Sequence, residues 1–169
     1  MTAPPAAGDD TRAFAVDDRE ALAAARLQLL ADTRRQLLIH LPQLAPGVLD
    51  SPAELAELRR IATAGRGAEI RLLLHNPAAA LRDGHRLIDL AQRLPSIWQV
   101  RTPEEPVDRA VTSAWLLGDG GGYLFLPDAA RPQGRAARRD RAAQAPLRQQ
   151  FDEIWERSPR ARELQTLDL

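Results

Sequence analysis

Three short apolar runs, separated by amphipathic stretches, constrain the fold of this chain more than any other feature. The runs are residues 37–41, 69–75 and 97–101, and apolar residues recur at helical spacing over 51–64 and 79–94. Runs that are apolar throughout are typical of strands buried on both faces. Because strand–helix–strand connections are right-handed crossovers, the alternation predicts a mainly parallel sheet with helices packed on it.

Local signals mark where the predicted helices begin and how they pack. Asp17 or Asp18 is placed to cap a first helix that ends near residue 35. Ser51 and Glu54 have the spacing of a capping box at the start of the second helix. Gly84 falls within the apolar stripe of the third, which predicts a close approach of that helix to the sheet.

The pattern changes after the third apolar run. Residues 110–117 and 123–126 are predicted strands, and the glycine-rich residues 118–122 between them favour a tight hairpin turn. A mobile surface loop is expected over 129–145, followed by a last helix from Pro146. The predicted fold class is therefore α/β, with a mainly parallel mixed sheet flanked by helices and a C-terminal β-hairpin and helix.

The length of 169 residues suits one domain with a core of its own. We expect a disordered leader over residues 1–16, a single domain over 17–158 and a C-terminal tail over 159–169. No apolar run approaches the roughly 20 residues that cross a bilayer, and the leader lacks the pattern of an export signal. The expected location is cytoplasmic without membrane contact, and the oligomeric state is left open.

Composition excludes several classes of chemistry. All 23 basic residues are arginine, and the sequence holds neither lysine nor cysteine. Schiff-base catalysis, a P-loop lysine, a cysteine nucleophile, thiolate zinc sites and disulfides are thereby excluded. The 23 acidic residues balance the arginines, which argues against a surface that coats nucleic acid. No cofactor is expected.

Polar residues gather at the predicted strand ends. His40, His75 and Arg101 end the three apolar runs, Asn76 follows the second, and His85 lies early in the next helix. Ligands of open α/β sheets bind beyond the carboxyl ends of the strands, so these residues form a candidate pocket. The alternative is that the histidines bond loop carbonyls and serve the fold. The spacing of the histidines does not favour a metal site, and none is expected.

Charged residues elsewhere allow two interpretations. An arginine-rich stretch either contacts phosphates or forms a solvated loop; it comprises Arg131, Arg135, Arg138, Arg139 and Arg141. Aromatic residues make up only 4% of the chain and none lies among these arginines, so a stacking platform for single strands is absent and nucleic-acid binding is not favoured. Arg86 and Asp89 on one helix face are predicted to form a solvated ion pair.

One segment resembles the catalytic strand of the phospholipase D superfamily, in which His-x-Lys-x-x-x-x-Asp precedes a glycine-containing turn into another strand. In this register Thr112 stands where that family has histidine, Ala114 stands where it has lysine, and only Asp119 matches. Phe151 and Trp155 are similar to the aromatic pair of the family's terminal helix. The resemblance spans most of residues 17–158, and Asp119 either joins the candidate pocket or serves the turn.

The resemblance implies a degenerate motif. The family's histidine attacks phosphorus and its lysine holds the phosphate charge, which threonine and alanine cannot do. The chain is also similar to a bacterial family of degenerate phospholipase-D-like domains, some of which follow acyltransferase domains. The expected function is therefore that of a pseudoenzyme, a non-catalytic binding or accessory domain with a protein partner such as an acyltransferase.

Two alternatives stay open. One is a small enzyme that uses His75 or His85 as general base and Arg101 as anion clamp. The other is a weak phosphate or nucleic-acid binder that acts through the stretch from Arg131 to Arg141.

Overall fold

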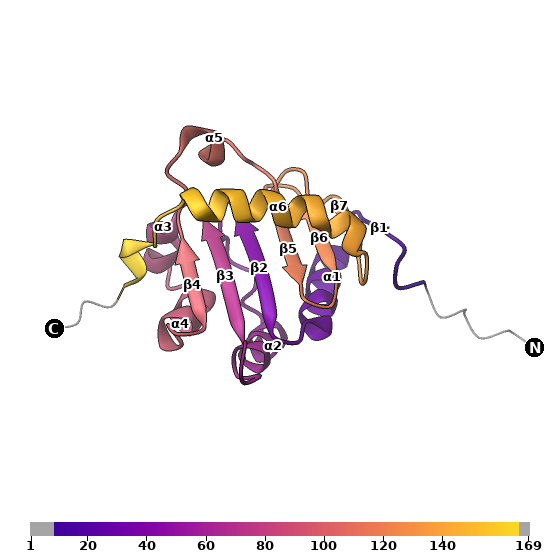
Figure 1. Ribbon diagram of the computed structural model, residues 1–169, viewed down its shortest axis with the longest axis horizontal. Helices are drawn as coiled ribbons and strands as arrows, with labels where there is room; N and C mark the ends of the chain where they lie inside the picture. Colours follow the sequence, from indigo (N-terminus) through magenta and orange to yellow (C-terminus); the bar gives the residue numbers. More distant parts are fainter. Residues whose placement is uncertain (1–8, 166–169) are drawn as a thin grey trace, which may run out of the picture.

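The computed structural model describes residues 9–165, which form a mixed sheet with helices on both faces (Figure 1). The sheet has seven strands in the order β1-β7-β6-β5-β2-β3-β4. In chain order the elements are β1 (Phe14–Val16), α1 (Arg19–Asp32), β2 (Gln36–Leu41), α2 (Pro52–Ala62), β3 (Glu69–Leu74), α3 (Pro77–Arg82), α4 (Arg86–Arg93), β4 (Trp98–Arg101), α5 (Pro106–Arg109), β5 (Ala114–Gly118), β6 (Tyr123–Leu126), β7 (Gly134–Ala137), α6 (Arg141–Arg157) and the 3-10 turn η1 (Arg162–Leu164).

The predicted α/β fold class, a mixed sheet flanked by helices, is confirmed, but the expectation of a mainly parallel sheet is wrong: among the described residues two strand pairs are parallel and four are antiparallel. The three apolar runs are β2, β3 and β4, which pair in parallel through the crossovers α2 and α3–α4. The remaining pairs, β2–β5, β5–β6, β6–β7 and β7–β1, are antiparallel. As a result β5 begins beside the carboxyl end of β2, and this edge of the sheet, called the carboxyl edge below, carries the ends of β2, β3 and β4 and the start of β5.

Two hydrophobic layers hold the sheet between its helices. On one face α6 lies across the strands, and its Leu147, Phe151, Ile154 and Trp155 pack on a layer that includes Trp115. On the other face α1, α2 and α4 bury their apolar sides in a larger core. α5 lies above the carboxyl edge (Figure 1). Burial of this apolar surface supplies most of the stabilisation.

The helix starts follow the capping signals of the sequence. Asp18 caps α1 by accepting from the amide of Ala21 at 2.7 Å. Ser51 and Glu54 form the predicted capping box of α2. Glu54 is buried and also pairs with the buried guanidinium of Arg26 on α1, so the second helix start is tied directly to the first helix.

The single helix predicted over 79–94 is wrong, because the segment forms α3 and α4. Gly84 separates them at a φ of +63°, a left-handed conformation that glycine adopts readily. Apart from the glycine and its chain neighbours, no heavy atom of the described residues lies within 4 Å of where its Cβ would be, so the predicted close approach of this glycine to the sheet is also wrong. Gly84 is therefore needed for the left-handed backbone conformation between α3 and α4, and not for close packing against the sheet.

The predicted leader and the predicted mobile loop meet in the sheet. β1 lies within the first and β7 within the second, and the register pairs Val16 with Gly134. A Cβ on Gly134 would collide with the carbonyl oxygen of Phe125, so only glycine fits there. α6 begins before Pro146, at Arg141, with Asp140 as its cap. Sequence patterns missed both strands because each is short and is fixed by its partner.

The start of the predicted tail also joins the sheet. Thr102 donates its amide to the carbonyl of Pro159, and Ala161 donates to Val100, both at 3.0 Å. These bonds cover part of the outer edge of β4. The rest of the predicted leader and tail, residues 1–8 and 166–169, lies outside the described residues. Over residues 9–165, no helix is both long and apolar enough to cross a membrane.

Candidate functional site at the carboxyl edge

Two of the three histidines meet at the carboxyl edge. His40 lies in β2 opposite Trp115 of β5, and His75 directly follows β3. Because β2 pairs His40 with Leu73 and side chains alternate along a strand, His75 lies on the same face of the sheet as His40. The Nε2 atoms of the two imidazoles are 3.2 Å apart, and the ring of His40 stacks on Trp115 at a centroid distance of 4.1 Å.

The partners of the two rings fix where the protons are. The Nδ1 atom of His40 lies 3.0 Å from the carbonyl oxygen of Ser113, which can only accept, so this nitrogen carries a proton. In a neutral ring the Nε2 atom of His40 is then an acceptor, and the Nε2–H of His75 donates to it. Within residues 9–165, the Nδ1 atom of His75 is then left with a free lone pair.

Burial keeps both imidazoles neutral. The His40 side chain is fully buried, and desolvation, reinforced by the neighbouring His75, lowers its pKa to about 3. His75 is half-buried, and its pKa is lowered by desolvation and then by the positive charge of Arg109, against an opposing effect of Asp108. At neutral pH the pair therefore presents a hydrogen-bond acceptor and no charge.

The charges beside the pair come from α5 and α6. Asp108 is buried, and its carboxylate accepts two hydrogen bonds from Arg157, at 2.7 and 3.0 Å. The adjacent Arg109 is exposed, and within residues 9–165 its guanidinium has no hydrogen-bond or ion-pair partner. An anion that reaches His75 would therefore meet one free guanidinium, while the buried carboxylate is already neutralised.

Asn76 and His85, both predicted for the pocket, serve helix starts. The side chain of Asn76 accepts from the amide of Ala79 and caps α3. His85 is buried, with Nδ1 accepting from the amide of Leu87 and Nε2 bonded to the carbonyl of Ala45 at 3.1 Å. Since both of its ring nitrogens are occupied, His85 has no free lone pair for a general base.

Arg101, the predicted anion clamp, is held against α6. It shares the face of the imidazole pair, but its guanidinium lies 4.5 Å from the ring centre of Trp155 and donates to the carbonyl of that residue at 2.8 Å. Its pKa is lowered by desolvation, with Glu156 opposing that shift. This contact ties the end of β4 to the helix that crosses the sheet.

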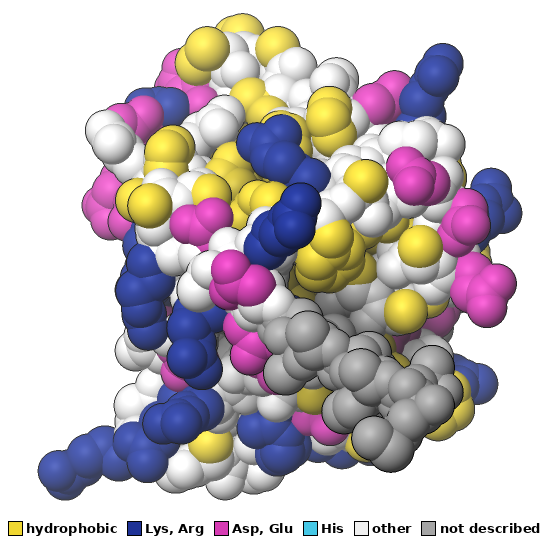
Figure 2. All heavy atoms as spheres, turned by 90° about the vertical axis from the view of Figure 1, so that its right-hand side faces the viewer, with side chains coloured by type: hydrophobic (Ala, Val, Ile, Leu, Met, Phe, Trp, Pro, Cys, Tyr) yellow, Lys and Arg dark blue, Asp and Glu magenta, His cyan; other side chains and the backbone are white. Residues whose placement is uncertain are grey.

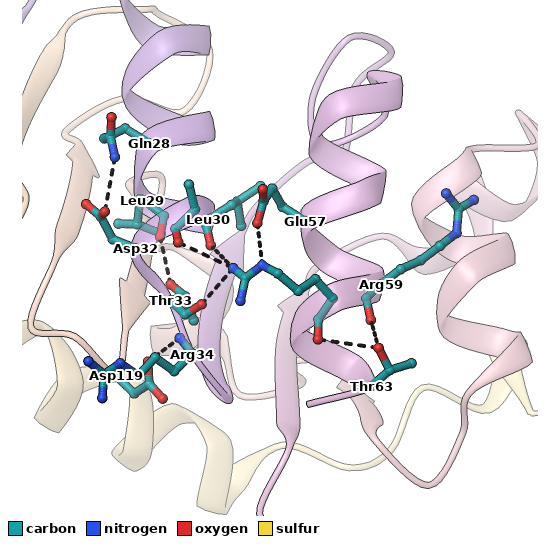
Figure 3. Close-up of polar contacts among 12 residues, drawn as sticks. Gln28, Leu29, Leu30, Asp32, Thr33, Arg34, Glu57, Arg59, Thr63 and Asp119 are labelled. Atoms are coloured by element: carbon teal, nitrogen blue, oxygen red, sulfur yellow. Dashed lines mark hydrogen bonds and ion pairs between the residues drawn. The ribbon is translucent and has the colours of Figure 1, made fainter. Parts of the chain in front are cut away.

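Asp119 lies at the opposite edge of the sheet, so it does not join the predicted pocket. It follows the last residue of β5, which pairs with Leu37 near the amino end of β2. Its carboxylate accepts from the backbone amides of Arg34, Arg35 and Gln36, at 2.8, 2.9 and 3.2 Å. Figure 3 shows Asp119 beside Arg34, below the end of α1. The carboxylate thus fastens the start of β2 to the end of β5.

The two other motif positions lie at the carboxyl edge. Thr112 is exposed and precedes β5, and Ala114 is buried as the first residue of that strand. Ser113, between them, supplies the carbonyl oxygen that orients His40. This edge therefore carries imidazole, but the imidazole belongs to β2 and to the end of β3.

Most guanidiniums of the arginine-rich stretch contact this chain. Arg138 makes two bonds to Asp32, at 2.9 and 3.0 Å, and this pairing raises its pKa and lowers that of Asp32. Arg135 lies over the ring of Phe125, Arg131 is 3.6 Å from Asp128, and Arg141 donates to the carbonyl of Asp119. Among described residues, the Arg139 side chain has no such partner.

On the surface near this stretch, positive and negative side chains also lie close together. Arginine and acidic side chains lie intermixed on the side of the molecule next to β1 and β7 (Figure 2). The prediction of a mobile loop is wrong, because β7 and the start of α6 order the stretch.

Sequence reasoning missed the residues that shape the imidazole pair. Trp115 lies in an apolar strand, and Asp108 and Arg109 lie in a four-residue helix with no periodic signal. No group of three or more metal-ligating side chains occurs in the described part of the chain. Two surface hollows, of about 530 and 410 Å³, lie beside β4 and between α2 and α4, and neither includes the pair.

Solved structures with the same fold include three proteins of low sequence identity. Nuc, a phospholipase D family member from Salmonella typhimurium, has a TM-score of 0.64 at 9% identity, over 89% of this chain and 98% of its own. The archaeal chromatin protein TrmBL2, whose structure shows a novel mode of DNA binding, has a TM-score of 0.63 at 16% identity, over 93% of this chain and 57% of its own. Phosphatidylserine synthase from Haemophilus influenzae Rd KW20 has a TM-score of 0.59 at 12% identity, over 93% of this chain and 41% of its own.

These likenesses confirm the phospholipase-D-like fold. The chain spans little more than half of the archaeal protein and less than half of the synthase. No curated protein is detectably similar to this chain in sequence. The family model described as "Domain of unknown function (DUF7931)" matches residues 18–167. The chain therefore belongs to the DUF7931 family, and its fold is that of the phospholipase D superfamily.

Proposed function

We propose that this phospholipase-D-like domain binds an anionic, phosphate-bearing ligand at the carboxyl edge and does not cleave phosphodiesters. The observation that carries the proposal is the state of the imidazole pair. His40 is buried, neutral and hydrogen-bonded at both nitrogens, so it cannot attack phosphorus. Thr112 and Ala114 supply neither a nucleophilic imidazole nor a cation, and the chain has no lysine.

The same geometry supports binding of a phosphate group in its singly protonated form. The free lone pair on Nδ1 of His75 accepts a hydrogen bond from a P–OH group, and Arg109 offsets the remaining negative charge. Because the second pKa of a phosphomonoester is about 6, affinity is expected to rise as the pH falls from 8 toward 6.

Two measurements test this proposal. Purified protein is expected to leave bis(p-nitrophenyl) phosphate intact; turnover that His75→Gln abolishes would overturn the non-catalytic assignment. In an NMR titration with inorganic phosphate, the ring resonances of His75 are expected to shift, and Arg109→Gln is expected to weaken that binding several-fold. Arg148→Gln, a change on an exposed part of α6, is the matched control. An unshifted His75 ring at tens of millimolar phosphate contradicts the binding site.

A second candidate function is acid–base catalysis by His75. It is favoured by the hydrogen-bonded chain from Ser113 through His40, which orients the second ring as a third group orients a catalytic base. This function requires a reaction that is slower in the His75→Gln protein than in the wild type. The other histidines of the chain must not take over the role of His75 in that reaction. A p-nitrophenyl acetate assay with wild-type, His75→Gln and His85→Gln proteins separates a specific base from background hydrolysis.

A further inference from the structure

A groove between α2 and α4 carries an excess of positive charge. This α2–α4 groove has a volume of about 410 Å³. The residues that line it are Pro52, Leu55, Arg59, Arg86, Asp89, Leu90 and Arg93. Three guanidiniums face one carboxylate there, although the whole chain has a net charge of zero. The groove lies on the helix-covered face of the sheet opposite α6, away from the imidazole pair.

The two helices present matching faces. Both connect parallel strands in succession, so they run in the same direction and the start of one lies beside the start of the other. Arg86 and Arg93 lie seven residues apart on α4, about 10.5 Å along its axis. Leu55 and Leu90 form the apolar floor of the groove between its charged side chains.

Helix stability accounts for two of the arginines but not for the third. Arg59 and Arg93 lie in the last turns of α2 and α4, where a positive charge interacts favourably with the helix dipole. Arg86 is the first residue of α4, where the same charge is unfavourable. Its placement therefore costs stability and calls for another explanation.

The guanidiniums are available to a partner. Asp89 pairs with Arg93 at 3.1 Å, so the predicted pair of Asp89 with Arg86 is wrong. Both members of the observed pair are more than 60% exposed, and such a pair exchanges partners at little cost. Within residues 9–165 the guanidiniums of Arg59 and Arg86 have no hydrogen-bond or ion-pair partner, and Figure 3 shows the Arg59 side chain extending from α2 toward the next helix.

We infer that the α2–α4 groove is a docking site for an acidic amphipathic helix of another protein. Two carboxylates placed two helical turns apart would match the spacing of Arg86 and Arg93, and arginine binds carboxylates through paired hydrogen bonds. Apolar side chains between those carboxylates would lie on Leu55 and Leu90. This site is independent of the proposed anion site at the carboxyl edge.

The test uses the full chain and two synthetic helix-forming peptides. One carries two glutamates seven positions apart with leucines between them, and the other has glutamines in place of the glutamates. Fluorescence anisotropy is expected to show salt-sensitive binding of the first peptide and at least about tenfold weaker binding of the second. Arg86→Gln and Arg93→Gln are each expected to weaken binding of the first peptide about fivefold to tenfold.

Matched variants and an alternative ligand complete the test. Arg148→Gln controls for the loss of one exposed charge, and His75→Gln is expected to leave peptide binding unchanged, which separates this site from the anion site. Failure of the glutamate peptide to bind at millimolar concentration overturns the inference, as does equal binding by Arg86→Gln. Binding to vesicles of phosphatidylglycerol but not to the peptide overturns it in favour of a lipid surface.

Discussion

Removal of the Asp119 carboxylate is expected to destabilise the fold without affecting the imidazole pair. In the replacement Asp119→Ala, three backbone amides at the start of β2 lose their acceptor. A hydrogen bond to a charged group contributes about 1.5–3 kcal/mol, and the partial exposure of this carboxylate reduces each to about 1 kcal/mol. The expected loss is therefore about 3 kcal/mol of a total stability of about 5–15 kcal/mol.

The assay is urea denaturation and thermal denaturation, each followed by circular dichroism and tryptophan fluorescence. A loss of about 3 kcal/mol corresponds to a decrease in Tm of about 6–12 °C for a chain of this size. Asp119→Asn keeps the oxygen that accepts from Arg34 and loses the one that serves Arg35 and Gln36, so about 2 kcal/mol is expected. Asp152→Asn, on the exposed side of α6, is the control and should change stability by less than about 0.5 kcal/mol.

One result would refute this reasoning. If Asp119→Ala unfolds with the wild-type midpoint while a phosphodiesterase activity of the wild-type protein disappears, the carboxylate acts in chemistry and not in the fold. Such a result would require Asp119 to act on a substrate at the carboxyl edge. The register of β5 with β2 argues against this, because it places Asp119 at the opposite edge of the sheet.

The remaining predictions concern titration, a buried carboxylate and a close backbone approach. His40 has a folded pKa of about 3 and an unfolded value of about 6.5, so below pH 6.5 the unfolded state binds the extra proton. Stability should fall by about 2 kcal/mol from pH 7 to pH 5 on this account, and denaturation of His40→Phe should show a flatter pH dependence. Arg157→Gln leaves the carboxylate of Asp108 buried and unpaired, so a lower urea midpoint is expected, and Asp108→Asn in the same chain should recover part of the loss. Gly134→Ala sets a methyl group against the carbonyl of Phe125 and should detach β1 and β7, seen as faster amide hydrogen exchange there, while normal exchange would contradict so close an approach of the two backbones.

Local signals were sufficient for the strands of the parallel half and for its first crossover helix. Continuous apolar runs identified β2, β3 and β4, and the capping box of Ser51 with Glu54 marked the start of α2. The glycine-rich turn between β5 and β6 was also predictable, because Gly121 adopts a positive φ there. These features depend on residues close together in the chain, so their chemistry is visible without the fold.

The candidate site was predictable only in part. Strand ends predicted that His40 and His75 lie at one edge, and the structure brings the two rings together there, because carboxyl ends of neighbouring parallel strands share an edge. The resemblance left Asp119 either in the same pocket or in the turn; it does not join the pocket, because the antiparallel direction of β5 carries that residue to the far edge. Arg109 was missed, since a single exposed arginine in a four-residue helix has no distinguishing pattern.

The sequence alone determined the α/β class, the caps of α1 and α2 and the absence of lysine and cysteine chemistry, because each follows from residue identity or short spacing. Only the tertiary structure decided that β1 and β7 pair, that two imidazoles share one hydrogen bond in a neutral state, and that Arg86 has no partner within residues 9–165. Strand partners, burial and proton positions depend on groups far apart in the chain. Folding alone brings those groups together, so no local pattern records them.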